Sequence, residues 1–209
     1  GRFMLQLLQD GGLRDDLTER IQNDSQNFTD EILNNLSETI RAEAILSITD
    51  TNPTYLVGGK AEGLRLAAGV FGSERIVDGV VVSAEFVNSW VQDIPGTEGL
   101  LHTIDSGVTV DEKLAAAEQL TELISQSNTV TEITAAIAQR FRGQDKIVLR
   151  SSSFDEDVDI IGPAPGVYES VTGIAVSDKL ALENAFREVV LSFFSEKAVS
   201  YRELKGLRH

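Results

Sequence analysis

The residues best suited to chemistry begin with a short glycine-lysine segment formed by Val57, Gly58, Gly59 and Lys60. Two adjacent glycines permit positive φ angles and close backbone approach, and the lysine could reach a phosphate as a point charge. The helix expected to follow would also present its N-terminus to an anion. The segment is not a P-loop, since Gly-x-x-x-x-Gly-Lys-Ser/Thr is absent. It therefore indicates either a phosphate site or a tight turn with an exposed lysine.

A second candidate follows a predicted strand over residues 146–149. There Arg150 precedes Ser151 and Ser152, and an acidic run occupies residues 155–157. Arginine at a strand end can bind phosphate or carboxylate through two parallel hydrogen bonds. It can equally form an internal ion pair with Asp155 or Glu156. The residues alone leave both interpretations open.

A third candidate is the segment Ile-Gly-Pro-Ala-Pro-Gly at residues 161–166. Two prolines and two glycines restrict its shape, so it could cover a ligand or simply connect a hairpin.

The two histidines, His102 and His209, lie in no nucleophile or metal-binding pattern. We therefore expect no catalytic residue within this chain.

Composition limits the classes of partner. The 209 residues carry a net charge of -15, which argues against binding duplex nucleic acid, because phosphate neutralisation needs clustered cations. A small polyanion can still be held by one or two cations. There is no cysteine, so a disulfide framework and a thiolate zinc site are excluded. No apolar run approaches the ~20 residues of a membrane span, and the first residues do not resemble a signal peptide. We expect a cytoplasmic protein.

The apolar pattern divides the chain into two parts. Residues 1–54 show narrow helical stripes that are broken near residue 50, and we interpret them as a helical extension whose apolar face runs to Ile45. Such stripes need a partner surface, which is either the main domain or, through self-association of residues 1–50, another chain. The main domain is predicted to span residues 55–209.

Strands and helices are mixed along the main domain. Residues 55–60 suggest a short strand or turn before a Gly-Gly loop, and further strands are predicted at 77–82, 146–149 and 167–176. Helices are predicted to start at Ser83, at capping boxes opened by Thr109 and Thr129, and at Ser177, the last one running toward Tyr201 and ending at Gly206. Trp90 is expected in the core. This order favours an α+β fold over a doubly wound parallel sheet.

Five segments between Tyr55 and His209 together resemble a known family. They read VGGKAEGLRLA, RIVDGVVVSAEFVNSWV, IVLRSSSFDED, GPAPGVYESVTGI and FFSEKAVSYRELKGLRH. In this order they resemble the nucleotide-binding domain of phosphoenolpyruvate synthase and pyruvate phosphate dikinase. The resemblance implies the N-terminal portion of an ATP-grasp-like domain.

The resemblance also implies roles for particular residues. Lys60 and Arg150 would contact the phosphates of ATP, and the loop from Gly162 to Gly166 would lie over them. Gly58, Gly59 and Ser151 would support this site. Glu156 and Asp157 match the family's acidic pair, which would organise the arginine loop. These are the expected cofactor-binding and supporting residues.

The resemblance further implies an activity for the complete protein. ATP would phosphorylate a histidine on a separate swivelling domain, and the phosphoryl group would then pass to pyruvate or a related acceptor. The carboxylates that hold Mg2+ would lie in a second half of the domain beyond residue 209, so the isolated chain is expected to be inactive. The expected partners are ATP and the remaining domains of the parent protein.

Two alternatives accompany this expectation. Ala61, Ala164, Pro165 and Val167 replace residues that the family's glycine motif and glycine-rich loop usually carry. The chain could therefore be a non-catalytic binding or regulatory module with a degenerate nucleotide site. It could also be the ATP domain of a phosphotransferase that acts on an antibiotic or a glucan.

Overall fold

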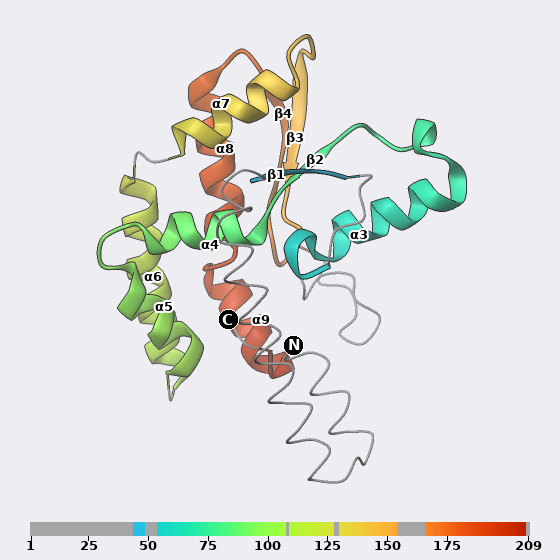
Figure 1. Cartoon of the computed structure of the whole chain (residues 1–209). Coiled ribbons are helices and arrows are strands. Elements are labelled where there is room, and N and C mark those ends of the chain that lie inside the picture. Colours follow the sequence, from blue (N-terminus) through green and yellow to red (C-terminus); the bar gives the residue numbers. More distant parts are fainter. Residues whose placement is uncertain (1–43, 49–53, 108, 128–129, 154–165, 208–209) are drawn as a thin grey trace, which may run out of the picture. The chain divides into compact units, whose positions relative to one another are not determined.

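The computed structural model describes residues 44–48, 54–107, 109–127, 130–153 and 166–207, with only the backbone described at 54–56. Residues 44–209 form one compact unit. Its elements are β1 (Ile45–Ser47), α3 (Thr54–Phe71), the 3-10 helix η2 (Ser73–Arg75), β2 (Val80–Val82), α4 (Ala84–Gln92), α5 (Thr97–Ser106), α6 (Val110–Gln126), α7 (Thr131–Arg140), β3 (Lys146–Arg150), β4 (Ser170–Ala175), α8 (Lys179–Ser192) and α9 (Glu196–Lys205) (Figure 1). The helices predicted before residue 44 lie outside the described residues, and the division of the chain at residue 54 stays a prediction.

The described strands form two small antiparallel sheets among many helices. β1 pairs with β2, and β3 pairs with β4. Between Ile147 and Leu149 the second ladder is irregular, and Gly173 on the opposite strand has a φ of 71°. Positive φ is typical of the glycine in a β-bulge, where two residues oppose one. Helices with antiparallel pairs confirm the predicted α+β class.

The helical prediction at Ile45 is wrong. Residues 45–47 form β1, with Leu46 opposite Val81 in the ladder. The side chain of Leu46 is buried in a small cluster with Val57, Ala61 and Val81. The periodic pattern that suggested a helix could not reveal a partner strand 35 positions later, since pairing of this kind is decided by tertiary contacts.

Several helix starts follow their local signals. The Ser83 hydroxyl accepts a hydrogen bond from Phe86 N at 3.3 Å, which confirms the predicted cap of α4. Thr109 and Glu112 form the predicted capping box of α6. These predictions succeed because a cap needs only residues within one turn.

Other helix bounds differ from the prediction. The N-cap of α7 is Val130, so this helix begins later than the Thr129 capping box implied, and Thr129 itself lies outside the described residues. Asp178, not Ser177, caps α8 by accepting a hydrogen bond from Ala181 N at 3.0 Å. The predicted continuous final helix is broken after Ser192. The strand predicted from Val77 begins at Val80.

The break between α8 and α9 has a local cause. Ser195 starts a new helix, because its hydroxyl accepts from Ala198 N at 3.2 Å. Arg202 of α9, only 6% exposed, donates to the carbonyl oxygen of Phe193 in the connection. Gly206, with a φ of 64°, ends α9 as predicted.

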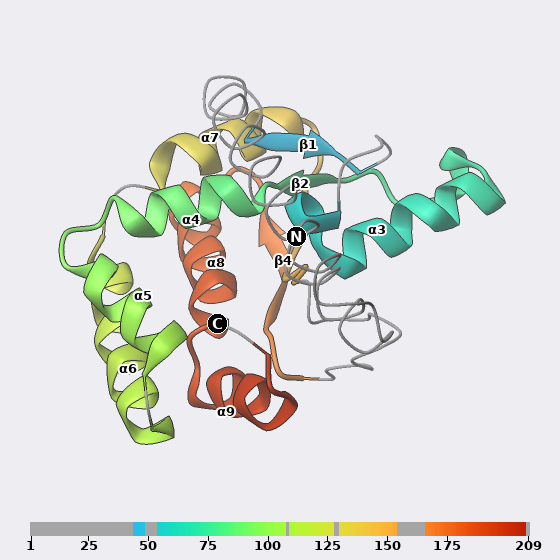
Figure 2. The same ribbon diagram turned by 60° about the horizontal axis from the view of Figure 1, so that its bottom comes forward.

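The main core lies among α4 to α8 and the β3–β4 hairpin. α8 packs against this hairpin, and Figure 2 shows α5 and α6 side by side. Trp90 is buried as predicted, and its ring meets that of Phe186 edge to face with centroids 5.7 Å apart. The largest fully buried apolar side chains of this core are Ile104, Leu120, Ile124, Ile137, Leu182, Val130 and Val199.

Among the helices in the described segments, none has the length and hydropathy that a membrane crossing needs.

Glu85, in the first turn of α4, has a carboxylate oxygen that is buried without a hydrogen-bond partner among the described residues. This burial raises the pKa of Glu85 above its ordinary value. The folded protein therefore binds its proton more tightly than the unfolded chain. Glu85 costs stability as pH rises from about 4.3, the ordinary carboxyl pKa, through the raised folded value.

We therefore expect Glu85→Gln to raise the melting temperature at pH 7, and this gain to vanish near pH 4. Circular dichroism melts at both values measure it. Glu98→Gln is the matched control, since Glu98 occupies the same position in the first turn of α5 but is exposed. An equal effect of both substitutions would contradict the role of burial.

Candidate functional site

The glycine-lysine segment lies inside α3 rather than in a loop between elements. Gly58 interrupts the helical geometry with φ 76° and ψ 173°. A Cβ atom at Gly58 would lie 1.8 Å from the carbonyl oxygen of Ser152. Only glycine permits both this φ and this approach. The glycine is therefore required by contact with the serine segment after β3.

Hydrogen bonds join these two segments across 91 or more residues of sequence. Gly59 N donates to Ser153 O at 3.0 Å. Ala61 N donates to Ser152 Oγ at 3.1 Å, and Ser152 Oγ donates to Val57 O at 2.6 Å. Ser152 thus caps the helix that restarts after Gly58. Two N–H groups that could have faced an anion are used within the protein.

Lys60 is the cation that this junction places beside the serine segment. Its ammonium lies 3.5 Å from Ser151 Oγ, at the limit of a hydrogen bond. The lysine is half-buried, whereas Ser151 is 2% exposed.

Arg65, one turn further along α3, forms an ion pair with Glu62 at 2.6 Å. The hydrogen bonds from Arg65 lower the pKa of Glu62. This pair holds the charge of Arg65 near Glu62.

Arg150 is the last residue of β3 and is exposed. The strand alternates, so that Ile147 and Leu149 are half-buried while Arg150 lies on the exposed face opposite Ser170 of β4. Within the described segments Arg150 forms no ion pair, and the acidic run 155–157 is not among them. The internal pairing predicted as an alternative, and the supporting roles of Glu156 and Asp157, stay predictions.

The end of the glycine-rich segment is anchored on α9. Gly166 has a φ of 67°, and the next two residues, Val167 and Tyr168, are buried against Ala198. Tyr168 stacks at a tilt on Phe193, with ring centroids 4.9 Å apart, and its hydroxyl oxygen accepts from Arg202 at 3.3 Å. Gly162 lies outside the described residues.

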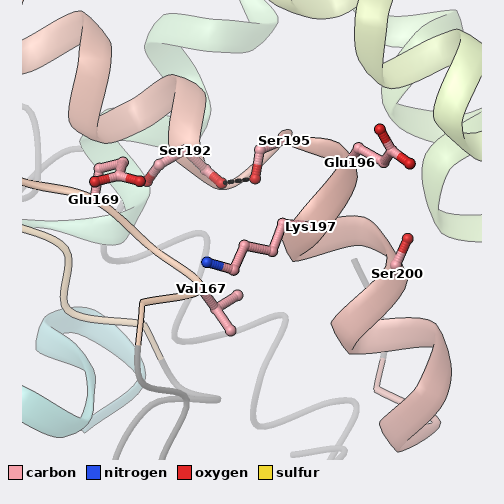
Figure 3. A pocket seen from close by; sticks show the side chains of 7 residues that line it. All are labelled: Val167, Glu169, Ser192, Ser195, Glu196, Lys197 and Ser200. Atoms are coloured by element: carbon pink, nitrogen blue, oxygen red, sulfur yellow. Dashed lines mark hydrogen bonds between the residues drawn. The ribbon is translucent and has the colours of Figure 1, made fainter.

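An open pocket beside this anchor was missed by the sequence reasoning. It has a volume of about 520 Å³ and is lined by Val167 and Glu169, by Ser192 at the end of α8, and by Ser195 and the first turns of α9 (Figure 3). Lys197, Glu169 and Glu196 are its charged lining residues. The walls come from three segments, so no local pattern could predict them. The one local signal for this pocket is Lys197, two residues after the helix cap Ser195.

Metal-binding groups are not gathered in the described part of the chain, where no three His, Cys, Asp or Glu side chains lie close enough to hold an ion. The Mg2+ ligands were expected beyond residue 209. Their place stays a prediction.

The sequence model of one protein family matches residues 54–209, which is more than half of the chain. That family is described as the AMP/ATP-binding domain of pyruvate phosphate dikinase. The chain belongs to this family. Membership confirms the resemblance found in the motifs, and the match contains both the Gly58–Lys60 and the Arg150–Ser153 segments. No curated protein matches the chain.

Proposed function

We propose that this chain is the first part of the ATP-binding domain of a dikinase-like phosphotransferase, in which ATP phosphorylates a histidine on a separate domain. The observation that carries the proposal is the contact between Lys60 and Ser151. It brings the Gly-Gly-Lys segment against the Arg-Ser-Ser segment inside the region matched by the dikinase family. An ATP-grasp-like architecture is part of this proposal.

The residues at this junction fit a polyphosphate. The half-buried ammonium of Lys60 extends from α3 and the exposed guanidinium of Arg150 from the end of β3. Gly58 lets these two elements approach closely, and backbone and serine hydrogen bonds join them. ATP supplies the transferable phosphoryl group when bound. Lys60 and Arg150 would bind phosphate oxygens and neutralise their charge, which is the main protein contribution to phosphoryl transfer. Phosphate binding by Gly162 and Gly166 belongs to the same proposal.

Further parts of the proposal concern the setting of the domain. Mg2+ would be held by carboxylates, because hard cations prefer oxygen ligands. The described residues gather no such set of side chains, so these carboxylates would lie outside them. The remaining domains of the parent protein would supply the histidine and the acceptor site. A cytoplasmic location would provide ATP.

Titration calorimetry with Mg-ATP tests this function. The full-length natural protein should bind Mg-ATP saturably below millimolar concentration and label a histidine with the transferred phosphoryl group. The 209-residue chain alone should fold but not turn over ATP. Absence of binding in the full-length protein would contradict the proposal. Robust ATP turnover by the isolated chain would contradict the idea that phosphoryl transfer needs further domains.

One observation favours the second candidate, a regulatory module with a degenerate site. Val167, where the family's loop carries a glutamine, is 8% exposed and packs into the cluster with Tyr168 and Ala198. An apolar side chain buried there donates no hydrogen bond to a phosphate. Under this candidate, no heat of binding would be measured across millimolar Mg-ATP.

A further inference from the structure

The pocket at the start of α9 presents a cation beside the end of the glycine-rich segment. If Gly166 carried a Cβ atom, that atom would lie 3.6 Å from the ammonium of Lys197. Figure 3 shows the Lys197 side chain extending from the first turn of α9 toward Val167. The pocket volume of about 520 Å³ leaves room for a small anionic group beside this ammonium.

The backbone that carries Lys197 is held firmly. Ser195 caps the helix, and Ala198 and Val199, which follow Lys197, are both 0% exposed. Arg202 ties α9 to the carbonyl of Phe193 and to the hydroxyl of Tyr168. Lys197 itself is exposed, so its ammonium extends into the pocket from an anchored backbone.

Among the described residues, the Lys197 ammonium forms no ion pair with the other charged residues of the pocket, Glu169 and Glu196. Figure 3 shows Glu196 directed away from Lys197 and Glu169 beside Ser192. The positive end of the α9 dipole adds to the attraction for an anion at this point.

The pocket adjoins the strand that pairs with Arg150. Ser170 lies opposite Arg150, and Gly166 precedes Ser170 by four residues, which span at most about 14 Å. Lys197 therefore borders the segment that leads into the end of the β3–β4 hairpin where Arg150 lies.

From these observations we propose that Lys197 binds phosphate oxygens as a third cation of the phosphate site, next to Gly166. The inference rests on the proposed function. The shared ligand chemistry is a phosphate group, either of bound ATP or of free inorganic phosphate.

The test compares Lys197→Ala and Lys197→Arg in the full-length natural protein, titrated separately with Mg-ATP and with inorganic phosphate. Lys197→Ala should weaken binding about ten-fold or more, because a charge-assisted hydrogen bond is lost, and Lys197→Arg should stay within about three-fold of wild type. A loss confined to ATP identifies the nucleotide as the source, and a loss for inorganic phosphate identifies the free anion.

Lys179→Ala is the matched control. Lys179 is an exposed lysine at the opposite end of α8, about 20 Å of helix away, and its loss should not change binding. Circular dichroism melts check that each variant folds. Wild-type binding by Lys197→Ala, with weakened ATP binding by Lys60→Ala, would overturn this inference alone. A wild-type protein that binds neither ligand would overturn the proposed function as well.

Discussion

Gly58→Ala is expected to lower the stability of the domain by about 3 kcal/mol or more, which corresponds to a fall in melting temperature of roughly 6–12 °C for a domain of this size. The added Cβ atom would lie 1.8 Å from Ser152 O, far inside contact distance. The φ of 76° adds a strain that L-residues avoid. Relief requires the two segments to separate, which would break the bonds from Gly59 N and Ala61 N. Thermal unfolding followed by circular dichroism measures the effect.

The same helix offers controls for this prediction. Gly63 and Gly69 also lie in α3, and a Cβ atom at either would meet nothing within 4 Å. Alanine there should leave the melting temperature unchanged or raise it slightly, because alanine favours helix more than glycine does. A wild-type melting curve for Gly58→Ala would show that the contact with Ser152 is not needed for stability.

Lys60→Ala and Arg150→Ala are each expected to weaken ATP binding about 10- to 100-fold in the full-length natural protein, and to reduce phosphorylation of the proposed acceptor histidine at least as much. Each removes a charge-assisted hydrogen bond to a phosphate, worth about 1.5–3 kcal/mol. Neither side chain is part of the core, so the fold should persist. Calorimetry gives the affinity, and radiolabel transfer from ATP gives the phosphorylation.

Matched cations separate site chemistry from general charge. Arg65→Ala removes an arginine of α3 that is paired with Glu62, and Lys146→Ala removes an exposed lysine from the same face of β3 as Arg150. Both should bind ATP as the wild type does. Normal affinity and labelling in both Lys60→Ala and Arg150→Ala would refute the assignment of these two cations.

Local signals predicted much of the secondary structure. The caps Ser83 and Thr109 are predictable from residue type, because each accepts a hydrogen bond from an N–H three residues later. Trp90 is buried, as expected. Where two cap residues are adjacent, as at Ser177 and Asp178, the pattern could not choose. The choice depends on the turn in which Asp178 N bonds to Ala175 O at the end of β4.

The sequence by itself determined the family, the α+β class and the pair of cation-bearing segments. Only the tertiary structure decided that these segments touch, that Gly58 is fixed by Ser152 and that Lys60 meets Ser151. It also decided that Ile45 belongs to a strand and that Lys197 borders a pocket. The physical reason is the range of the interactions. Caps and periodicity act within about one turn of chain, whereas the junction of α3 with the end of β3 joins residues about 90 positions apart, whose approach depends on the packing of everything between them.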